Sequence, residues 1–233
     1  MFAVVQFPGS NDDRDMRFAF KAVLGVDARL VWHKDVSLPA STEAVLCPGG
    51  FSYGDYLRAG AMAQYSPLMA AVKEFAERGG PVLGVCNGFQ VLCESGLLPG
   101  VLIRNHHLDF VCEFAHVRVE RSAAPFTSRA RKGDVLRIPI KHGEGAYFAH
   151  ADVMDELVRE DRIALRYCEP DGTVSPAANP NGSLANVAGV VNAAGNVMGL
   201  MPHPEHAVEA GLGGEDGRVL LGSLVDHLVG GGR

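Results

Sequence analysis

The amino-acid sequence predicts an α/β fold built on an open, mostly parallel, twisted sheet with helices on both faces. Up to Gly100, short apolar runs of strand length alternate with segments of helical spacing, which is the order of βαβ units. Beyond Gly100, strand-like runs follow one another across short turns, which is typical of antiparallel pairing. We therefore expect a smaller antiparallel or mixed sheet from the second half, either separate or extending the edge of the first.

The first half begins with an apolar run, 2–7, that predicts a strand. The segment 12–24 has helical spacing and offers these apolar residues to the core: Met16, Phe18, Phe20, Val23 and Leu24. A helix over 67–78 is indicated by a proline at its start and a glycine pair after its end. The other elements expected here are strands over 28–32, 44–47 and 81–85 and a helix over 87–95.

The second half contains several strand-like runs and one further helix. The turns between them are rich in Gly, Asp and Asn, which favour tight reversals. The strands are expected over 111–121, 134–140, 163–168, 185–191 and 197–201, and the helix over 217–228. Because no repeat or low-complexity linker interrupts the chain, we expect a single domain over 1–229 and a flexible tail over 230–233.

Composition and charge exclude several classes of protein. A formal net charge of −6 over 233 residues argues against a nucleic-acid-binding surface. No apolar run approaches the roughly 18 residues that a membrane span needs, and the N-terminus lacks the basic segment of a signal peptide. The five cysteines are odd in number and form no CxxC pair, which favours a reducing, cytoplasmic location over disulfides or structural zinc.

The most informative segment places Cys86 between a predicted strand and a predicted helix. Gly84 and Gly88 flank it as Gly-x-Cys-x-Gly, the cysteine counterpart of a nucleophile elbow. The N-terminus of the following helix is expected to lower the thiol pKa and favour the thiolate. We therefore interpret Cys86 as a nucleophile. The other four cysteines are interpreted as core residues: Cys47, Cys93, Cys112 and Cys168.

A base for this nucleophile is suggested by the run Met201-Pro-His-Pro-Glu205. The prolines keep His203 extended, and Glu205 is placed to accept the Nδ1 proton of the imidazole and fix its tautomer. Cys86, His203 and Glu205 would then form a nucleophile–base–orienter triad. The adjacent His206 suggests a metal site, but neighbouring residues seldom converge on one ion, so no metal is expected.

Three polar segments complete the candidate site. Gly49 and Gly50 follow a predicted strand and can turn backbone N–H groups toward a carbonyl, forming an oxyanion hole with the N–H of Asn87. In an open parallel sheet, this segment and Cys86 lie at the same edge. Two further clusters, 141–145 and 179–183, are interpreted either as turns or as groups that select an amide substrate.

These segments together resemble the class I glutamine amidotransferases of the triad type, and within them the glutaminase subunits of phosphoribosylformylglycinamidine synthase. The resemblance runs from residue 2 to about residue 228 and implies a flavodoxin-like arrangement of the main sheet. The matching motifs are Phe7-Pro-Gly-Ser-Asn11, Pro48-Gly-Gly-Phe-Ser-Tyr-Gly-Asp-Tyr-Leu-Arg58, Gly84-Val-Cys-Asn-Gly-Phe-Gln90, His142-Gly-Glu-Gly145, Asn181-Gly-Ser183 and Met201-Pro-His-Pro-Glu205.

The resemblance implies a role for each matching position. Cys86 would attack the side-chain amide of glutamine, His203 would shuttle protons, and Glu205 would orient His203. Gly50 and Asn87 would supply oxyanion N–H groups. The substrate-binding residues are expected to be Gly49, Gly50, Asn87, Gln90 and His142. Three positions depart from the family pattern without touching the triad: Asp12, Ala59 and His206.

The resemblance also implies partners. Ammonia would pass to a large synthetase subunit that converts formylglycinamide ribonucleotide to formylglycinamidine ribonucleotide, accompanied by a small third subunit. ATP and Mg would bind the synthetase, and this chain would need no cofactor. Two alternatives stay open: a glutaminase subunit of another synthase, such as one making pyridoxal phosphate or histidine precursors, and a thiol stress protein with a similar cysteine elbow.

Overall fold

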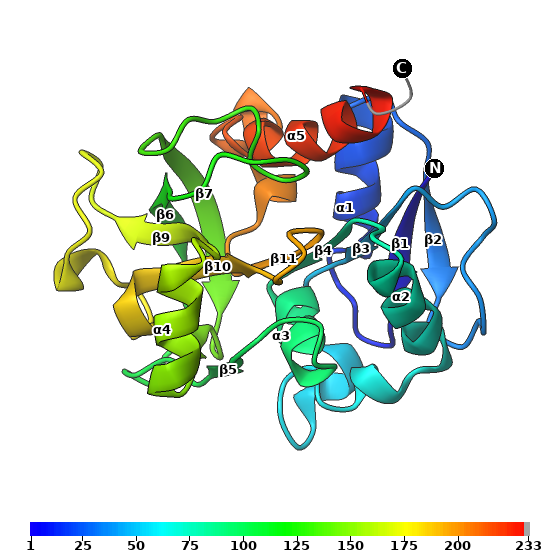
Figure 1. The fold of residues 1–233 in the computed structure, drawn as a ribbon, viewed down its shortest axis with the longest axis horizontal. Coiled ribbons are helices and arrows are strands. Elements are labelled where there is room, and N and C mark those ends of the chain that lie inside the picture. Colours follow the sequence, from blue (N-terminus) through cyan, green and yellow to red (C-terminus); the bar gives the residue numbers. More distant parts are fainter. Residues whose placement is uncertain (231–233) are drawn as a thin grey trace.

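The computed structural model describes residues 1–230 and confirms the α/β class. A nine-stranded sheet crosses the molecule (Figure 1). Its strands, in spatial order, are β2 (Ala28–Trp32), β1 (Phe2–Gln6), β3 (Ala44–Cys47), β4 (Val82–Val85), β11 (Val197–Leu200), β10 (Val187–Val191), β9 (Ile163–Cys168), β6 (Val111–Val119) and β7 (Val135–His142).

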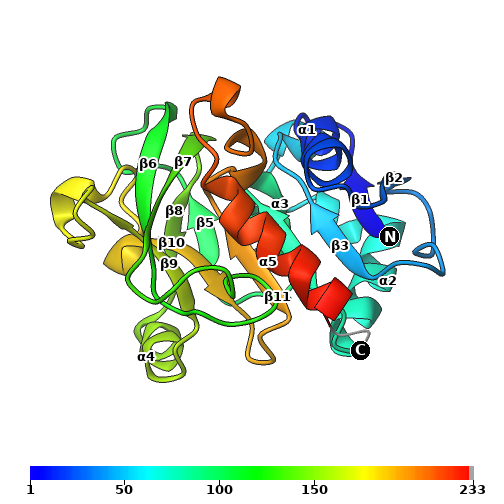
Figure 2. The ribbon, with the colours of Figure 1, turned by 90° about the horizontal axis from the view of Figure 1, so that it is seen from above.

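The first five strands of this order form a parallel half. Each pairs with its neighbour in parallel, from β2 through β1, β3 and β4 to β11. Helices α1 (Asp13–Phe18) and α5 (Gly217–Gly230) lie on one face, and α2 (Pro67–Glu77) and α3 (Asn87–Glu94) on the other (Figure 1). Figure 2 shows α5 lying across its face of the sheet. Because helices cover both faces, β3 and β4 are buried along their whole length, which explains their uninterrupted apolar sequences.

The remaining strands form an antiparallel half that extends the edge of the same sheet. β10, β9, β6 and β7 each pair antiparallel with the preceding strand. A separate two-stranded antiparallel sheet pairs β5 (Val101–Ile103) with β8 (Ala146–Phe148). These two strands and the helix α4 (Ala151–Arg159) were not predicted. Each strand has only three residues, and α4 buries only Leu157 completely, so the apolar patterns are weak.

The first predicted helix differs in detail from the observed one. α1 ends at Phe18 and continues as a π-helical turn, Ala19–Val23. Met16 and Phe20 are buried as predicted, whereas Phe18, which was assigned to the core, is 47% exposed. Residues four apart share a helix face, and a residue two positions after Met16 points to the opposite side. Phe18 therefore faces away from the sheet.

At the C-terminal end, α5 continues through Gly230, which the sequence had assigned to the tail. The rest of that predicted tail, residues 231–233, lies outside the described residues. Among the helices of residues 1–230, none has the length and apolar character needed to cross a membrane.

The twist of the sheet brings its far edge back to the centre. In the sheet order, β11, β10, β9 and β6 separate β4 from β7. Nevertheless the Pro139 carbonyl on β7 accepts a hydrogen bond from the His203 N–H at 2.8 Å. The Lys141 carbonyl on the same strand accepts one from the Cys86 thiol at 3.7 Å. Sheets of this size coil as their strands twist, so the antiparallel half closes over the end of the parallel half.

Candidate active site

Cys86 occupies a strained elbow between β4 and α3, as predicted. Its φ of +50° lies in a region that side chains rarely adopt. The flanking glycines are needed for packing, because a Cβ at Gly88 would overlap the Cys47 carbonyl oxygen of β3. A Cβ at Gly84 would lie 2.8 Å from the Gly88 carbonyl. The strand, the turn and the helix can therefore approach one another only without side chains at these two positions.

The thiol of Cys86 is held as a neutral group, contrary to the sequence expectation of a thiolate. The residue is only 6% exposed, and burial raises the pKa of the thiol well above its ordinary value, with Asp12 and Glu205 adding to the shift. The Lys141 ammonium and the Asn87 N–H lower the pKa but do not compensate. Desolvation thus outweighs the helix N-terminus. A base must remove the proton when the sulfur attacks.

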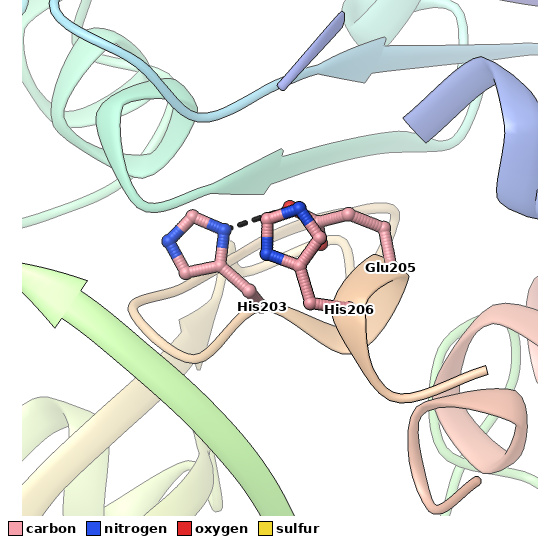
Figure 3. A group of neighbouring side chains, drawn as sticks. All are labelled: His203, Glu205 and His206. Atoms are coloured by element: carbon pink, nitrogen blue, oxygen red, sulfur yellow. Dashed lines mark hydrogen bonds and ion pairs between the residues drawn. The ribbon is translucent and has the colours of Figure 1, made fainter. Parts of the chain in front are cut away.

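That base is available in the predicted His203–Glu205 pair. His203 Nδ1 lies 2.7 Å from Glu205 Oε1, and both side chains are buried (Figure 3). Burial lowers the pKa of His203 to about 3 and raises the pKa of Glu205 to about 7. With Glu205 ionised, Nδ1 carries the proton and Nε2 keeps its lone pair. Nε2 has no hydrogen-bond partner within residues 1–230, so it is free to act as a base.

The nucleophile and the base follow adjacent strands of the parallel half. The Cys86 N–H donates to the Leu200 carbonyl of β11 at 2.8 Å, and His203 follows Leu200 after two residues. Within the described chain, however, the thiol bonds to the Lys141 carbonyl and not to His203. Proton transfer to Nε2 would therefore require the thiol to exchange the Lys141 carbonyl for the imidazole.

The glycine strip after β3 is shaped by close packing. Gly50 has a φ of +142°, and a Cβ there would lie 2.5 Å from the Asn11 N and 2.6 Å from the Gly9 carbonyl oxygen. At Gly49 a Cβ would overlap the Asp12 carboxylate and lie 2.7 Å from Cε1 of His203. Gly50 lines the cavity beside Cys86, whereas Gly49 lies behind it.

Asn87 and Gln90 connect the elbow helix to the loops around it. The side-chain oxygen Oδ1 of Asn87 accepts a hydrogen bond from the Ser52 N–H at 3.1 Å, and its side-chain amide Nδ2 donates to Gln90 Oε1 at 2.9 Å. Gln90 in turn donates to the Glu144 carbonyl at 2.6 Å. The Asn87 side chain therefore connects neighbouring loops. The backbone N–H of Asn87 is directed at the Cys86 sulfur and is available to bind an oxyanion.

These residues surround a cavity of about 200 Å³ with Cys86 in its wall. Four of the predicted site residues line it: Cys86, Gly50, Gln90 and His142. His203 and Glu205 are buried and do not line the cavity. The cavity thus joins both halves of the sheet.

His142, at the end of β7, is held by the second polar cluster of the sequence. The Asn181 amide donates to His142 Nε2 at 2.9 Å and to the Gly145 carbonyl at 2.9 Å. Accepting at Nε2 places the ring proton on Nδ1, which has no partner among residues 1–230. Burial lowers the pKa of His142 to about 3. His142 is therefore a neutral ring with a buried Nδ1–H donor that no other group within residues 1–230 uses.

Sequence reasoning missed four charged residues that also line the cavity: Asp12, Asp55, Lys141 and Glu144. Burial, followed by the charge of Glu144, raises the pKa of Asp55 to about 6. Three of these residues lie within segments singled out in the sequence, but nothing in the local pattern indicated which side chains would face inward. Asp12 was noted only as a departure from the family pattern.

Two groups of three side chains bring possible metal-ligand atoms within 4.8 Å of one another. One comprises His203, Glu205 and His206, and contains the base and its orienter. The other comprises Asp12, Asp15 and His206, but Asp12 already pairs with the Lys141 ammonium at 2.5 Å. Each group therefore shares residues with the His203–Glu205 pair or with the Asp12–Lys141 ion pair.

The remaining cysteines were assigned to the core, and this is confirmed for three of them. Cys47, Cys93 and Cys168 are buried, and burial raises the pKa of each thiol. Cys112 is exposed on β6, and that assignment is wrong. Its strand is poorly covered over the first residues, where the burial alternation is weak. All five cysteines are free.

Comparison with known proteins gives matches over nearly the whole chain. Residues 1–213 match the model of the CobB/CobQ-like glutamine amidotransferase domain. The chain is 54% identical to the phosphoribosylformylglycinamidine synthase subunit PurQ of Moorella thermoacetica, covering 97% of this chain and 95% of that protein. The PurQ subunit of Bradyrhizobium diazoefficiens is also 54% identical, with 97% of both chains covered.

A solved structure supports the same relationship. A chain in the structure of PurLQS from Thermotoga maritima superposes with a TM-score of 0.86 at 42% identity, covering 97% of this chain and 98% of that one. The sequence matches and the site geometry, a cysteine elbow with a buried His–Glu pair, point to the same family. The chain belongs to the CobB/CobQ-like glutamine amidotransferase family.

Proposed function

We propose that this chain is the glutaminase subunit of a phosphoribosylformylglycinamidine synthase. It hydrolyses glutamine to glutamate and ammonia and delivers the ammonia to a synthetase subunit that forms formylglycinamidine ribonucleotide with ATP. Similarity to PurQ subunits over 97% of the chain supports the assignment. The single structural observation that carries it is the strained Cys86 elbow beside a buried, hydrogen-bonded His203–Glu205 pair.

The chemistry begins with a neutral thiol. His203 Nε2 accepts the Cys86 proton as the sulfur attacks the carbon of the glutamine side-chain amide. The oxygen of the tetrahedral intermediate takes up negative charge, which the N–H groups of Gly50 and Asn87 stabilise. The imidazolium then donates its proton to the leaving nitrogen, releasing ammonia and a glutamyl thioester on Cys86.

The second half-reaction uses the same groups in reverse. His203 Nε2 removes a proton from a water molecule, and the resulting hydroxide attacks the thioester carbon. When the intermediate collapses, the carbon–sulfur bond breaks and the sulfur recovers a proton from the imidazolium. Glutamate leaves, and the resting thiol is restored. Glu205 keeps the imidazole in the required tautomer through both steps.

The charge of the cavity suits an amino acid. The carboxyl groups of Asp55 and Glu144 lie on its wall, and negative charge on them makes the cavity attractive to a cation. They match the α-ammonium of glutamine, while the free Nδ1–H of His142 matches an oxygen of its carboxylate. Gln90 is positioned by Asn87 and the Glu144 carbonyl to hold the substrate.

The partners follow from this division of work. A large synthetase subunit binds ATP, Mg and formylglycinamide ribonucleotide, and a small third subunit completes the assembly; this chain needs no cofactor of its own. The similarity of the chain to a component of PurLQS from Thermotoga maritima supports such an assembly. The five free cysteines favour a reducing compartment, and we place the protein in the cytoplasm.

The test is to assay the assembled synthase with glutamine or with ammonium salt as the nitrogen donor. Cys86→Ser should abolish glutamine-dependent synthesis and leave ammonia-dependent synthesis largely intact, because the thiol only generates ammonia. Cys168→Ala is the control, because Cys168 is a buried cysteine on β9 that does not line the cavity. Glutamine-dependent synthesis at the normal rate in Cys86→Ser would reject the proposal.

A further inference from the structure

A second carboxylate, that of Asp12, faces the base of the triad. Asp12 lies just before α1 and is 3% exposed. Its Oδ1 pairs with the Lys141 ammonium at 2.5 Å. Its other oxygen, Oδ2, lies 3.6 Å from His203 Nδ1. The two oxygens of one carboxylate therefore contact a cation on β7 and the ring on which catalysis depends.

The packing around Gly49 confirms that the Asp12 carboxylate and the His203 ring lie side by side. A side chain at Gly49 would meet the Asp12 carboxylate and the Cε1 edge of His203 at once. Nothing larger than glycine therefore fits between the carboxylate, the ring and the backbone after β3. Backbone contacts fix Asp12 as well, because its N–H donates to the Gly49 carbonyl at 3.2 Å and its carbonyl accepts the Met16 N–H at 2.8 Å.

The environment of His203 contains charged and titratable groups from every element packed against it. They are Glu205 and His206 on its own turn, Asp12 and Asp15 at the start of α1, Lys141 and His142 on β7, and Cys86 at the elbow. Glu205 is the nearest to Nδ1, at 2.7 Å. Asp12 is the other carboxylate with an oxygen within 4 Å of that nitrogen.

We propose that Asp12 is a positioning residue for His203: its carboxylate, balanced by Lys141, supports Glu205 in stabilising the imidazolium that forms when His203 takes the Cys86 proton. This inference rests on the proposed function and deepens it. The proton moves from sulfur to Nε2 and later to the leaving nitrogen, and Asp12 neither gains nor loses one. A buried anion close to a developing cation lowers the energy of the charged state without reorganisation.

A simple structural ion pair would not explain this arrangement. Lys141 needs only Oδ1, whereas Oδ2 is turned to the imidazole and not to solvent. The backbone carbonyl of Lys141 also accepts a hydrogen bond from the Cys86 thiol. The Asp12–Lys141 pair thus connects the loop after β1 to β7 beside Cys86 and His203. A change in the charge of either partner would alter the pKa of both Cys86 and His203.

The test compares Asp12→Asn, which keeps the shape and removes the charge, with Asp15→Asn in the assembled enzyme. Asp15 is a matched control because its side chain is 56% exposed and contacts His206 rather than His203. Asp12→Asn should lower kcat for glutamine hydrolysis by about tenfold or more, the effect of one pKa unit in charge stabilisation. KM for glutamine should not change. Asp15→Asn should lower kcat much less than Asp12→Asn, because Asp12 is the stronger of the two influences on His203.

The pH profile supplies a readout that a purely structural role would not move. Asp12 raises the pKa of Glu205 and Lys141 lowers it. The acid limb of kcat should therefore move to lower pH in Asp12→Asn and to higher pH in Lys141→Met. If Asp12→Asn does not fold, as judged by its melting temperature, the proposal is tested by the direction in which the acid limb of kcat moves in Lys141→Met.

Three outcomes would overturn the inference: unchanged kcat in Asp12→Asn, an equal loss in Asp15→Asn, or acid limbs that do not shift in opposite directions in the folded variants. Loss of the proposed function itself would look different. In that case the wild-type assembly would fail to hydrolyse glutamine, or would still do so in Cys86→Ser.

Discussion

The two halves of the sheet contribute to the site in different ways. The parallel half carries the proposed nucleophile, the proposed base and the glycine strip, each within three residues of the end of a strand, so that neighbouring strands bring them together. The antiparallel half contributes Lys141, His142 and Glu144 from the end of β7, which reaches the site only because the sheet coils. The groups proposed for the chemistry thus meet through adjacent strands, whereas the substrate pocket also needs the far edge of the sheet.

The two contributions are also stabilised differently. In the parallel half, glycines allow backbones to approach until a single Cβ would overlap a carbonyl oxygen, as at Gly88. In the antiparallel half, buried polar contacts fix the residues, as in the Asn181 amide that holds His142. Substitutions in the two halves should therefore fail for different reasons, one by disrupting the elbow and its proton transfer, the other by weakening substrate binding.

The largest effect is expected at Glu205 in the parallel half. Glu205→Gln removes the charge that stabilises the imidazolium, and kcat should fall by roughly 10²–10⁴-fold, as for orienting carboxylates in other triads. In the wild type, kcat/KM should fall as the pH drops through the raised pKa of Glu205, about 7, because the neutral acid donates to Nδ1 and leaves the proton on Nε2. Stopped assays of glutamate release across pH measure both.

A variant that keeps the wild-type acid limb without Glu205 would contradict this mechanism, because another group would then set the limb. Glu209→Gln serves as the control and should keep both the rate and the profile, because Glu209 is half-buried and lies at the start of an exposed segment, 210–213, outside the cavity.

The next effect contrasts two glycines, one from each half. Gly88→Ala should destabilise the protein by about 1–3 kcal/mol through overpacking, and should also lower kcat because the elbow must shift. Gly143→Ala should be tolerated, since a Cβ there would meet only Phe110, at 3.7 Å. Thermal unfolding of both variants, followed by glutaminase assays, measures the difference. Equal melting temperatures would remove the distinction between the two halves.

A smaller effect is expected at His142 in the antiparallel half. His142→Phe removes the free Nδ1–H and leaves the Asn181 amide short of one acceptor, so KM for glutamine should rise by about tenfold, the value of a hydrogen bond to a charged group. The kcat should change less, because His142 takes no part in proton transfer. Steady-state kinetics give both constants. A loss confined to kcat would place His142 in the chemistry instead.

The smallest change is a difference in labelling between two cysteines. An electrophilic glutamine analogue should modify Cys86, and free glutamine should protect it, because the base activates this thiol only when the cavity is filled productively. A general alkylating reagent should modify the exposed Cys112 first, with no protection by glutamine. Peptide mapping after each reagent measures the sites. Glutamine-protected labelling mainly at Cys112 would disprove the assignment of the nucleophile.

Much of the fold, the elbow at Cys86 and the pairing of His203 with Glu205 could be predicted from sequence because their signals are local. Glycines around Cys86 and prolines around His203 restrict the backbone within a few residues, and the predicted strands of the parallel half lie where the apolar runs are. The protonation state of the thiol could not be predicted, since it depends on burial in the folded chain. One group in contact with the sulfur comes from β7, a strand distant in both sequence and sheet order.

The charged residues of the cavity show the same limit. Asp12 and Lys141 are 129 residues apart in the sequence and meet only in the folded chain. The prediction that Phe18 and Cys112 are buried was wrong for a simpler reason. It relied on the apolar residue type and not on the helix or strand face on which each residue lies. Position on a helix or strand face, rather than residue type, decides such cases.

The proposed chemistry depends above all on Cys86 acting as a covalent nucleophile. The most direct measurement is mass spectrometry of the assembled enzyme, quenched with acid during turnover with glutamine. A glutamyl thioester should appear on the peptide that contains Cys86, should disappear when glutamine is exhausted, and should be absent from Cys86→Ser. Turnover without this adduct, or an adduct on another cysteine, would contradict the mechanism.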